Sequence, residues 1–339
     1  MDKPEEVLAR ANAGDAEAQI ALGRNFEEKG HTPLARAWYA RAVKAENPVA
    51  MRLLARSLFT LPPMVIGHAV QMMQAAAALG DAEAMHFCAL FAAMDPNLPD
   101  RWNVACELSG RAAAQGFALA QAEMEFLKNM QGEMETLSRA VPIRMVHESP
   151  RIGIVENFAS PEICDWFIAR AKPRLHRALV HDEIGGGARA DDQRDNSSAE
   201  FNTGEADLVL LLVQARIAAI ADTPRIQLET SSVLHYVPGQ RFKPHFDFME
   251  PAVLGHAKDI VRRGQRVATF LLYLNDDYEG GETEFPRLDF RYKGRKGDAL
   301  MFWNVDPDGR PDLKTLHAGL QTTRGEKWLL SQWLRLPSQ

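Results

Sequence analysis

Three residues in the second half of the chain are of types that bind metal ions. His245 and Asp247 stand two positions apart in PHFD. If this segment is a strand, residues i and i+2 point to the same face, so an imidazole and a carboxylate converge on one ion. His317, in TLHAG, lies in a later strand-like segment and supplies a third ligand. Two histidines and one carboxylate leave half of an octahedron open, as in non-haem Fe(II) oxygenases.

The region around these residues is expected to be rich in short strands. From residue 226 onward, short apolar runs alternate with Gly, Pro, Asn and Asp. The expected strands lie in IQLETSSVLHYV, RFKPHFDF, VATFLLYLN, GETEFP, DALMFWN and KWLLSQWLRL. This pattern favours a sandwich, a barrel or a jelly roll. Before it, we expect a helix that begins at Ser160 with Pro161 in its first position, a charged loop over 181–200, and a helix over 203–221 capped by Thr203. The basic stretches 258–266 and 291–296 are expected to be loops or hairpin ends.

The first 125 residues are alanine-rich and contain an internal repeat. AGDAEAQIALG recurs as LGDAEAMHFCA, and two weaker copies follow the same pattern. Equivalent alanines, spaced by 32, 34 and 36 residues, are Ala18, Ala50, Ala84 and Ala120. This period is typical of paired-helix solenoids. Asp15 and Asp81 fit the N-terminal cap or first turn of a repeated helix.

The repeated block resembles Sel1-like repeats, which are related to the tetratricopeptide family. The resemblance covers about residues 10–125 and implies a surface for a protein partner. The alternative is a helical appendage that only caps or dimerises the second domain. We therefore predict helical repeats over 1–125, a closing helix and linker over 126–150, and a second domain over 151–339.

The second domain resembles the prolyl 4-hydroxylase-like family of Fe(II)/2-oxoglutarate dioxygenases. The segments that carry the resemblance are IVENFASPEICDWFI, LHYVPGQRFKPHFD, RVATFLLYLNDDYEGGETEFP, KGDALMFWN and HAGLQTTRGEKWLLSQWLR. The resemblance implies a double-stranded β-helix, or jelly roll, flanked by helices. The chain as a whole would then be an α+β multidomain protein. Phe242 departs from the family, which often has tyrosine at this position.

The same resemblance assigns roles to individual residues. His245, Asp247 and His317 would bind the iron. Lys327 would pair with the distal carboxylate of 2-oxoglutarate, because a buried dicarboxylate needs a cation at its far end. Four further positions have both a functional and an ordinary interpretation. Tyr236 would line the cosubstrate site or be a core tyrosine, and Thr269 would line that site or be an ordinary strand threonine. Arg194 would contact substrate or be an exposed loop arginine. Trp328 would contact substrate or only form a wall of the pocket.

The expected reaction is hydroxylation of a C–H bond with release of succinate and CO2. A prolyl residue of a protein or peptide, recruited by the repeats, is the first expectation, as in procollagen-proline 4-dioxygenases. The cofactors implied are Fe(II), 2-oxoglutarate and O2, with ascorbate as a rescuing reductant. The alternatives are hydroxylation of a free amino acid or another small molecule, AlkB-like nucleic-acid repair, and a non-enzymatic interaction scaffold.

Composition limits these alternatives. The net charge of −6 disfavours phosphate-backbone binding, so no nucleic-acid partner is expected. No apolar run reaches the roughly 18 residues of a membrane helix, and MDKPEEVLARANAGD lacks a secretory h-region. Three cysteines without CxxC spacing argue against a disulfide framework and a cysteine zinc site. We expect a cytoplasmic protein, and the oligomeric state stays open.

Overall fold

The computed structural model describes residues 3–59, 61, 65–178, 180–181, 188–189, 194–202 and 204–336. These residues separate into two compact units. The first contains the chain up to Glu135 together with Asp207–Leu211, and the second contains the remainder. The boundaries expected at residues 125 and 150 stay predictions.

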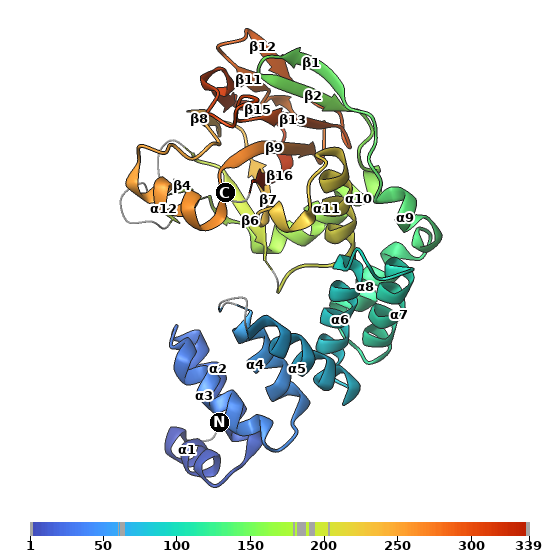
Figure 1. The fold of residues 1–339 in the computed structure, drawn as a ribbon, viewed down its shortest axis with the longest axis vertical. Helices are drawn as coiled ribbons and strands as arrows, with labels where there is room; N and C mark the ends of the chain where they lie inside the picture. Colours follow the sequence, from blue (N-terminus) through green and yellow to red (C-terminus); the bar gives the residue numbers. More distant parts are fainter. Residues whose placement is uncertain are drawn as a thin grey trace. The chain divides into compact units, whose positions relative to one another are not determined.

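The first unit consists of helices that follow one another in a stack (Figure 1). Each helix contacts the next along the chain. The helices are α1 (Pro4–Asn12), α2 (Ala16–Glu28), α3 (Thr32–Val43), α4 (Pro48–Leu58), α5 (Ile66–Ala78), α6 (Ala82–Met94), α7 (Arg101–Ala114) and α8 (Ala118–Leu127). The predicted helical repeat is therefore confirmed as an architecture.

The repeated motif marks the start of every second helix. The side chains of Asp15, Asn47 and Asp81 each accept a hydrogen bond from a backbone N–H three residues later, in α2, α4 and α6. Each donor belongs to one of the aligned alanines, whose side chains are buried. A polar cap and a small buried residue at one spacing thus let each helix begin against its neighbours.

The second unit is built on antiparallel sheets. The large sheet has the strand order β1-β2-β13-β9-β16-β7-β6-β3, and the small sheet has the order β12-β11-β14-β8. The strands of the large sheet are β1 (Arg144–Glu148), β2 (Arg151–Val155), β3 (His176–Arg177), β6 (Ser197–Phe201), β7 (Ser231–Tyr236), β9 (Arg266–Tyr273), β13 (Ala299–Trp303) and β16 (Lys327–Arg335). The small sheet contains β8 (Phe242–His245), β11 (Thr283–Phe285), β12 (Phe290–Tyr292) and β14 (His317–Gly319).

Shorter elements complete this unit. Short strands form the pairs β4 (Val180–His181) with β5 (Ala188–Arg189), and β10 (Glu279–Gly280) with β15 (Thr322–Arg324). The helices outside the repeat stack are α9 (Met134–Leu137), α10 (Pro161–Ala171), α11 (Leu208–Ile220) and α12 (Leu254–Arg263).

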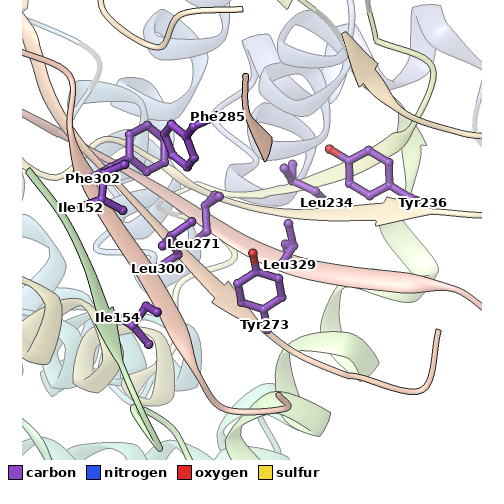
Figure 2. Packing of buried hydrophobic residues seen from close by; sticks show 10 residues of the cluster. All are labelled: Ile152, Ile154, Leu234, Tyr236, Leu271, Tyr273, Phe285, Leu300, Phe302 and Leu329. Carbon is purple, nitrogen blue, oxygen red and sulfur yellow. The ribbon is translucent and has the colours of Figure 1, made fainter. Parts of the chain in front are cut away.

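A cluster of buried apolar side chains from both sheets forms a core of this unit, and Figure 2 shows these side chains. Leu234, Leu271, Leu300 and Leu329 come from four strands of the large sheet, and Phe285 comes from the small sheet. Alternating residues of each strand point inward, so the apolar positions of the short runs meet in one core. The second domain is thus the expected jelly roll.

Most of the elements expected from the sequence are present, with three corrections. The prediction of a loop over 181–200 was wrong for residues 181, 188–189 and 197–200, which belong to β4, β5 and β6. Helix α10 begins after a Ser160 cap with Pro161 at its first position, as predicted. Helix α11 begins at Leu208 rather than 203, because the Asp207 side chain caps it, and Thr203 lies outside the described residues. The prediction of a loop over 258–266 was wrong for residues 258–263, which belong to α12. No helix in the described part of the chain is long and apolar enough to cross a bilayer.

The repeated caps differ in burial, which gives a stability prediction. Asp81 also binds the buried Arg52 guanidinium at 2.8 Å, whereas Asp15 binds Arg10, whose side chain is 50% exposed. We expect Asp81→Ala to lower the free energy of unfolding by about 2–3 kcal/mol, and Asp15→Ala to lower it by clearly less. Urea unfolding followed by helical circular dichroism measures both. Asp81→Asn keeps a capping oxygen, so its loss in the free energy of unfolding should be smaller than that of Asp81→Ala. Equal losses in the two alanine variants would contradict this account.

Candidate metal centre

The three predicted ligands meet at one end of the small sheet. His245 is the last residue of β8, and it pairs in register with His317, the first residue of β14. Asp247 lies in a bend two residues beyond the end of β8, so it does not share a strand with His245 as the sequence suggested. The bend still brings its carboxylate to the imidazoles: one ligand atom from each residue lies within 4.8 Å of the others.

Backbone contacts orient both imidazoles toward the same point. The Nδ1 atoms of His245 and His317 lie 2.8 and 3.0 Å from the carbonyl oxygens of Lys243 and Thr315. A carbonyl only accepts, so each Nδ1 carries the proton and each Nε2 keeps its lone pair. The Nε2 atoms lie 3.6 and 3.5 Å from the two carboxylate oxygens of Asp247. Three lone-pair donors therefore converge, as ligands of one ion do.

Burial and neighbouring charges shift the pKa values of His245 and Asp247. Burial, followed by the neighbouring His317, lowers the pKa of His245 to about 3. Burial alone would raise the pKa of Asp247, but the two imidazoles and a hydroxyl hydrogen bond hold it below its ordinary value. Two imidazole nitrogens beside an ionised carboxylate in a buried site suit a divalent cation.

Thr269 holds the Asp247 carboxylate through a hydrogen bond. Its hydroxyl donates to Asp247 Oδ2 at 2.7 Å and accepts from Asn304 Nδ2 at 3.0 Å, and both Thr269 and Asn304 are fully buried. The hydroxyl of Thr269 thus binds Asp247 rather than facing a ligand. The expectation that Thr269 lines the cosubstrate site stays a prediction. A side chain that orients a ligand from behind cannot be recognised from spacing alone.

A cavity of about 490 Å³ opens beside the three ligands. Lys327, on β16, lines it and is only 1% exposed. Its Nζ donates to the carbonyl oxygen of Gly281 at 2.5 Å and lies 5.3 Å from the ring centre of Tyr236, which also lines the cavity. Burial lowers the pKa of Lys327 to about 7. Within the described residues no carboxylate forms an ion pair with Lys327, and its role as the anchor of a carboxylate stays a prediction.

The remaining two substrate candidates separate. Arg194 lines the cavity, as the sequence suggested. Trp328 does not: adjacent residues of a strand face opposite sides, so it points away from Lys327 and stacks on His235 with ring centres 4.0 Å apart. Its assignment as a wall of the site was wrong. The tryptophan that lines the cavity is Trp333, which lies six residues after Lys327 on β16 and therefore on the same face of the strand. The two-residue period of a strand could have identified Trp333 from the sequence.

The arrangement has the donors that a metal-bound dicarboxylate requires. Two nitrogen ligands and one oxygen ligand would suit Fe(II), and the cavity that they line would leave room for further ligands of that ion. Lys327 lies in the same cavity, and no carboxylate of the described residues forms an ion pair with it. The residues present therefore fit an iron ion and a chelating 2-oxo acid whose far end reaches a cation.

Comparison with known proteins agrees with this site. The family model for the 2OG-Fe(II) oxygenase superfamily matches residues 231–335. Prolyl 4-hydroxylase 1 of Arabidopsis thaliana is 35% identical over 205 residues, which is 56% of this chain and 71% of that protein. The chain belongs to the prolyl 4-hydroxylase-like 2OG-Fe(II) oxygenases, whose members use Fe(II) and 2-oxoglutarate.

Two solved structures are also similar to parts of the chain. One is the viral collagen prolyl hydroxylase of Paramecium Bursaria Chlorella virus-1 in a 2OG complex, with 29% identity, a TM-score of 0.42, and coverage of 54% of this chain and 95% of that one. The other is a Sel1 repeat protein from Oxalobacter formigenes, with 18% identity, a TM-score of 0.30, and coverage of 40% and 72%.

The hydroxyl beneath Asp247 gives a testable consequence. Thr269→Val keeps the shape of the side chain but removes its hydrogen bond to the ligand carboxylate. We expect Fe(II) affinity to fall about 10- to 100-fold, as is typical when the partner of a metal ligand is lost. Anaerobic Fe(II) titration measures the effect. Thr269→Ser retains the hydroxyl and should bind iron nearly as well as the natural protein; equal affinity in the valine variant would show that the bond does not support the site.

Proposed function

We propose that this protein hydroxylates prolyl residues of a protein or peptide, as a procollagen-proline 4-dioxygenase does, and releases succinate and CO2. The observation that carries the proposal is the pairing of an open-sided ligand triad with a buried lysine in one cavity. The relatives named as prolyl 4-hydroxylases support the prolyl target. Iron with 2-oxoglutarate and O2 supplies the oxidising chemistry when bound.

The chain's own residues position these reactants. His245, Asp247 and His317 hold the metal, and Lys327 pairs with the distal carboxylate of 2-oxoglutarate. Tyr236 packs beside Lys327 across the β7–β16 pairing and limits the length of the cosubstrate site. The buried walls exclude bulk water from the cosubstrate, which restricts its oxidation in the absence of substrate. Ascorbate would rereduce iron that is oxidised in such futile turnover.

Two further parts of the proposal concern the substrate. The helical repeats would recruit the polypeptide, since the stack presents an extended surface. Hydroxylation of a free amino acid or another small molecule is the second candidate, and the buried Arg194 in the cavity favours it, because a guanidinium binds the carboxylate of such a molecule well. A non-enzymatic scaffold would not need the complete ligand triad and the buried lysine.

Direct product analysis tests the proposed reaction. The full-length protein is incubated with Fe(II), 2-oxoglutarate, ascorbate and air, together with either proline-containing peptides or free L-proline. We expect succinate and a substrate that gains one oxygen atom on proline, measured by mass spectrometry. His317→Ala is the inactive control. Oxidation at a residue other than proline, or only on the free amino acid, would replace the polypeptide-proline proposal.

The buried lysine predicts a pH dependence of cosubstrate binding. Lys327 must be charged to pair with a carboxylate, and its pKa is lowered to about 7. Below that pH the lysine already carries its proton, so the Kd of 2-oxoglutarate should be constant. Above it, binding must take up a proton, and the Kd should rise up to about tenfold per pH unit. Anaerobic absorption titrations of the Fe(II) protein between about pH 6 and 8.5 measure this dependence on either side of the lysine pKa.

A matched variant separates Lys327 from other titrating groups. Lys327→Arg keeps its charge throughout this range, so its Kd, whatever its absolute value, should vary much less with pH. A natural protein whose Kd is flat across the range would show that Lys327 is not the pH-dependent partner of the cosubstrate.

A further inference from the structure

Most charged side chains around the cavity already have a partner of opposite charge. Glu229 accepts from Arg266 at 2.5 Å and from Arg335 at 2.6 Å. Arg263 donates to both carboxylate oxygens of Asp259 at 2.8 Å. Glu229 and Arg263, which line the cavity, therefore each have an ion-pair partner within the protein.

The other charged residues of the lining divide into three kinds. Glu200 pairs with His176 at 2.6 Å. Asp247 faces the metal position, and Lys327 is assigned to the distal carboxylate of 2-oxoglutarate. Arg194 alone is left without a charged partner among the described lining residues.

Arg194 lines the cavity and is held by contacts with two neighbouring side chains. The residue is 8% exposed, and its Nε donates to the amide oxygen of the buried Asn196 at 2.8 Å. Its guanidinium lies 4.9 Å from the ring centre of Phe242, which offers no hydrogen-bond acceptor. Within the described part of the chain, no carboxylate forms an ion pair with it. The two terminal nitrogens of the guanidinium therefore remain as a preoriented pair of donors.

A buried cation without a counter-ion is costly, and a ligand carboxylate removes that cost. Iron and 2-oxoglutarate would not supply a counter-ion for Arg194, as a count of the charges in the filled site shows. Iron with one aspartate and two neutral histidines carries a net charge of +1, which the carboxylate that chelates iron offsets. The second carboxylate of 2-oxoglutarate offsets Lys327. The positive charge of Arg194 remains for the substrate.

We propose that the substrate carries a carboxylate that binds the two terminal nitrogens of Arg194 in a bidentate pair. This inference rests on the proposed function and specifies its substrate class. The carboxylate comes either from the α-carboxyl group of the hydroxylated residue or from an acidic side chain next to it in a polypeptide.

The backbone places this anion site close to the iron. Arg194 forms a β-bridge with Phe242, and the Phe242 ring stacks on the imidazole of His245 with ring centres 3.5 Å apart. A single aromatic ring thus separates the guanidinium from an iron ligand. A carboxylate held there belongs to the residue that is hydroxylated or to its immediate neighbour.

Two pairs of probes distinguish the sources of the carboxylate. N-acetyl-L-proline is compared with N-acetyl-L-prolinamide, and the capped peptide acetyl-Glu-Pro-Gly-amide is compared with acetyl-Gln-Pro-Gly-amide. Binding is measured without oxygen, from the change in the absorption band of the Fe(II)–2-oxoglutarate protein. We expect one of the two acids to bind at least about tenfold more tightly than its neutral counterpart, because a bidentate guanidinium–carboxylate pair is lost in the amide.

Arg194→Gln should abolish this preference while the Kd of 2-oxoglutarate changes little, and its intact absorption band reports that the site is folded. Arg241→Gln, an exposed arginine in the segment next to Phe242, is the matched control and should keep the preference. The proposal is overturned if neither acid is preferred, if Arg194→Gln keeps the preference, or if that variant loses 2-oxoglutarate affinity instead. Absence of the absorption band in the natural protein would contradict the proposed function itself.

Discussion

The site depends on one buried carboxylate. Asp247 lies between two imidazoles that are each fixed by a backbone carbonyl, and a hydroxyl donates to it from below. An ionised carboxylate is expensive to bury unless it is paired and hydrogen-bonded. The two histidines offer nitrogen lone pairs beside this carboxylate, so a bound cation would complete the electrostatics of the site.

Strand alternation distributes the remaining chemistry. On β16, Lys327 and Trp333 face the cavity, while Trp328, one position from the lysine, packs on the opposite side of the sheet. The same period places Tyr236 beside Lys327 on the neighbouring strand. The large sheet therefore supplies the floor and the cationic end of the cavity, and the small sheet supplies the two histidines. Neither sheet forms the site alone, which links catalytic geometry directly to closure of the jelly roll.

Residue type and period made part of the site predictable from the sequence, and the predictions failed where tertiary contacts decide. The repeated helix caps were recognisable from a side-chain type at a fixed spacing, whereas the roles of the metal ligands and of Lys327 rested on the resemblance of the surrounding segments to a known family. Asp247 was expected on a strand but lies beyond its end, since local alternation cannot show where β8 stops. Residues 258–263 were predicted to be a loop, although α12 is held in place by Asp259, whose partner Arg335 is distant in sequence. Likewise, the contact between Thr269 and Asp247 depends on two segments that meet only in the fold.

The most direct test of this account is an anaerobic titration of the metal-free protein with Fe(II) and 2-oxoglutarate, followed by visible absorption. The account predicts a weak metal-to-ligand charge-transfer band that requires both additions and is absent in His245→Ala. A folded natural protein that shows no such band, or a His245→Ala variant that keeps it, would contradict the assignment of His245, Asp247 and His317 as the iron site.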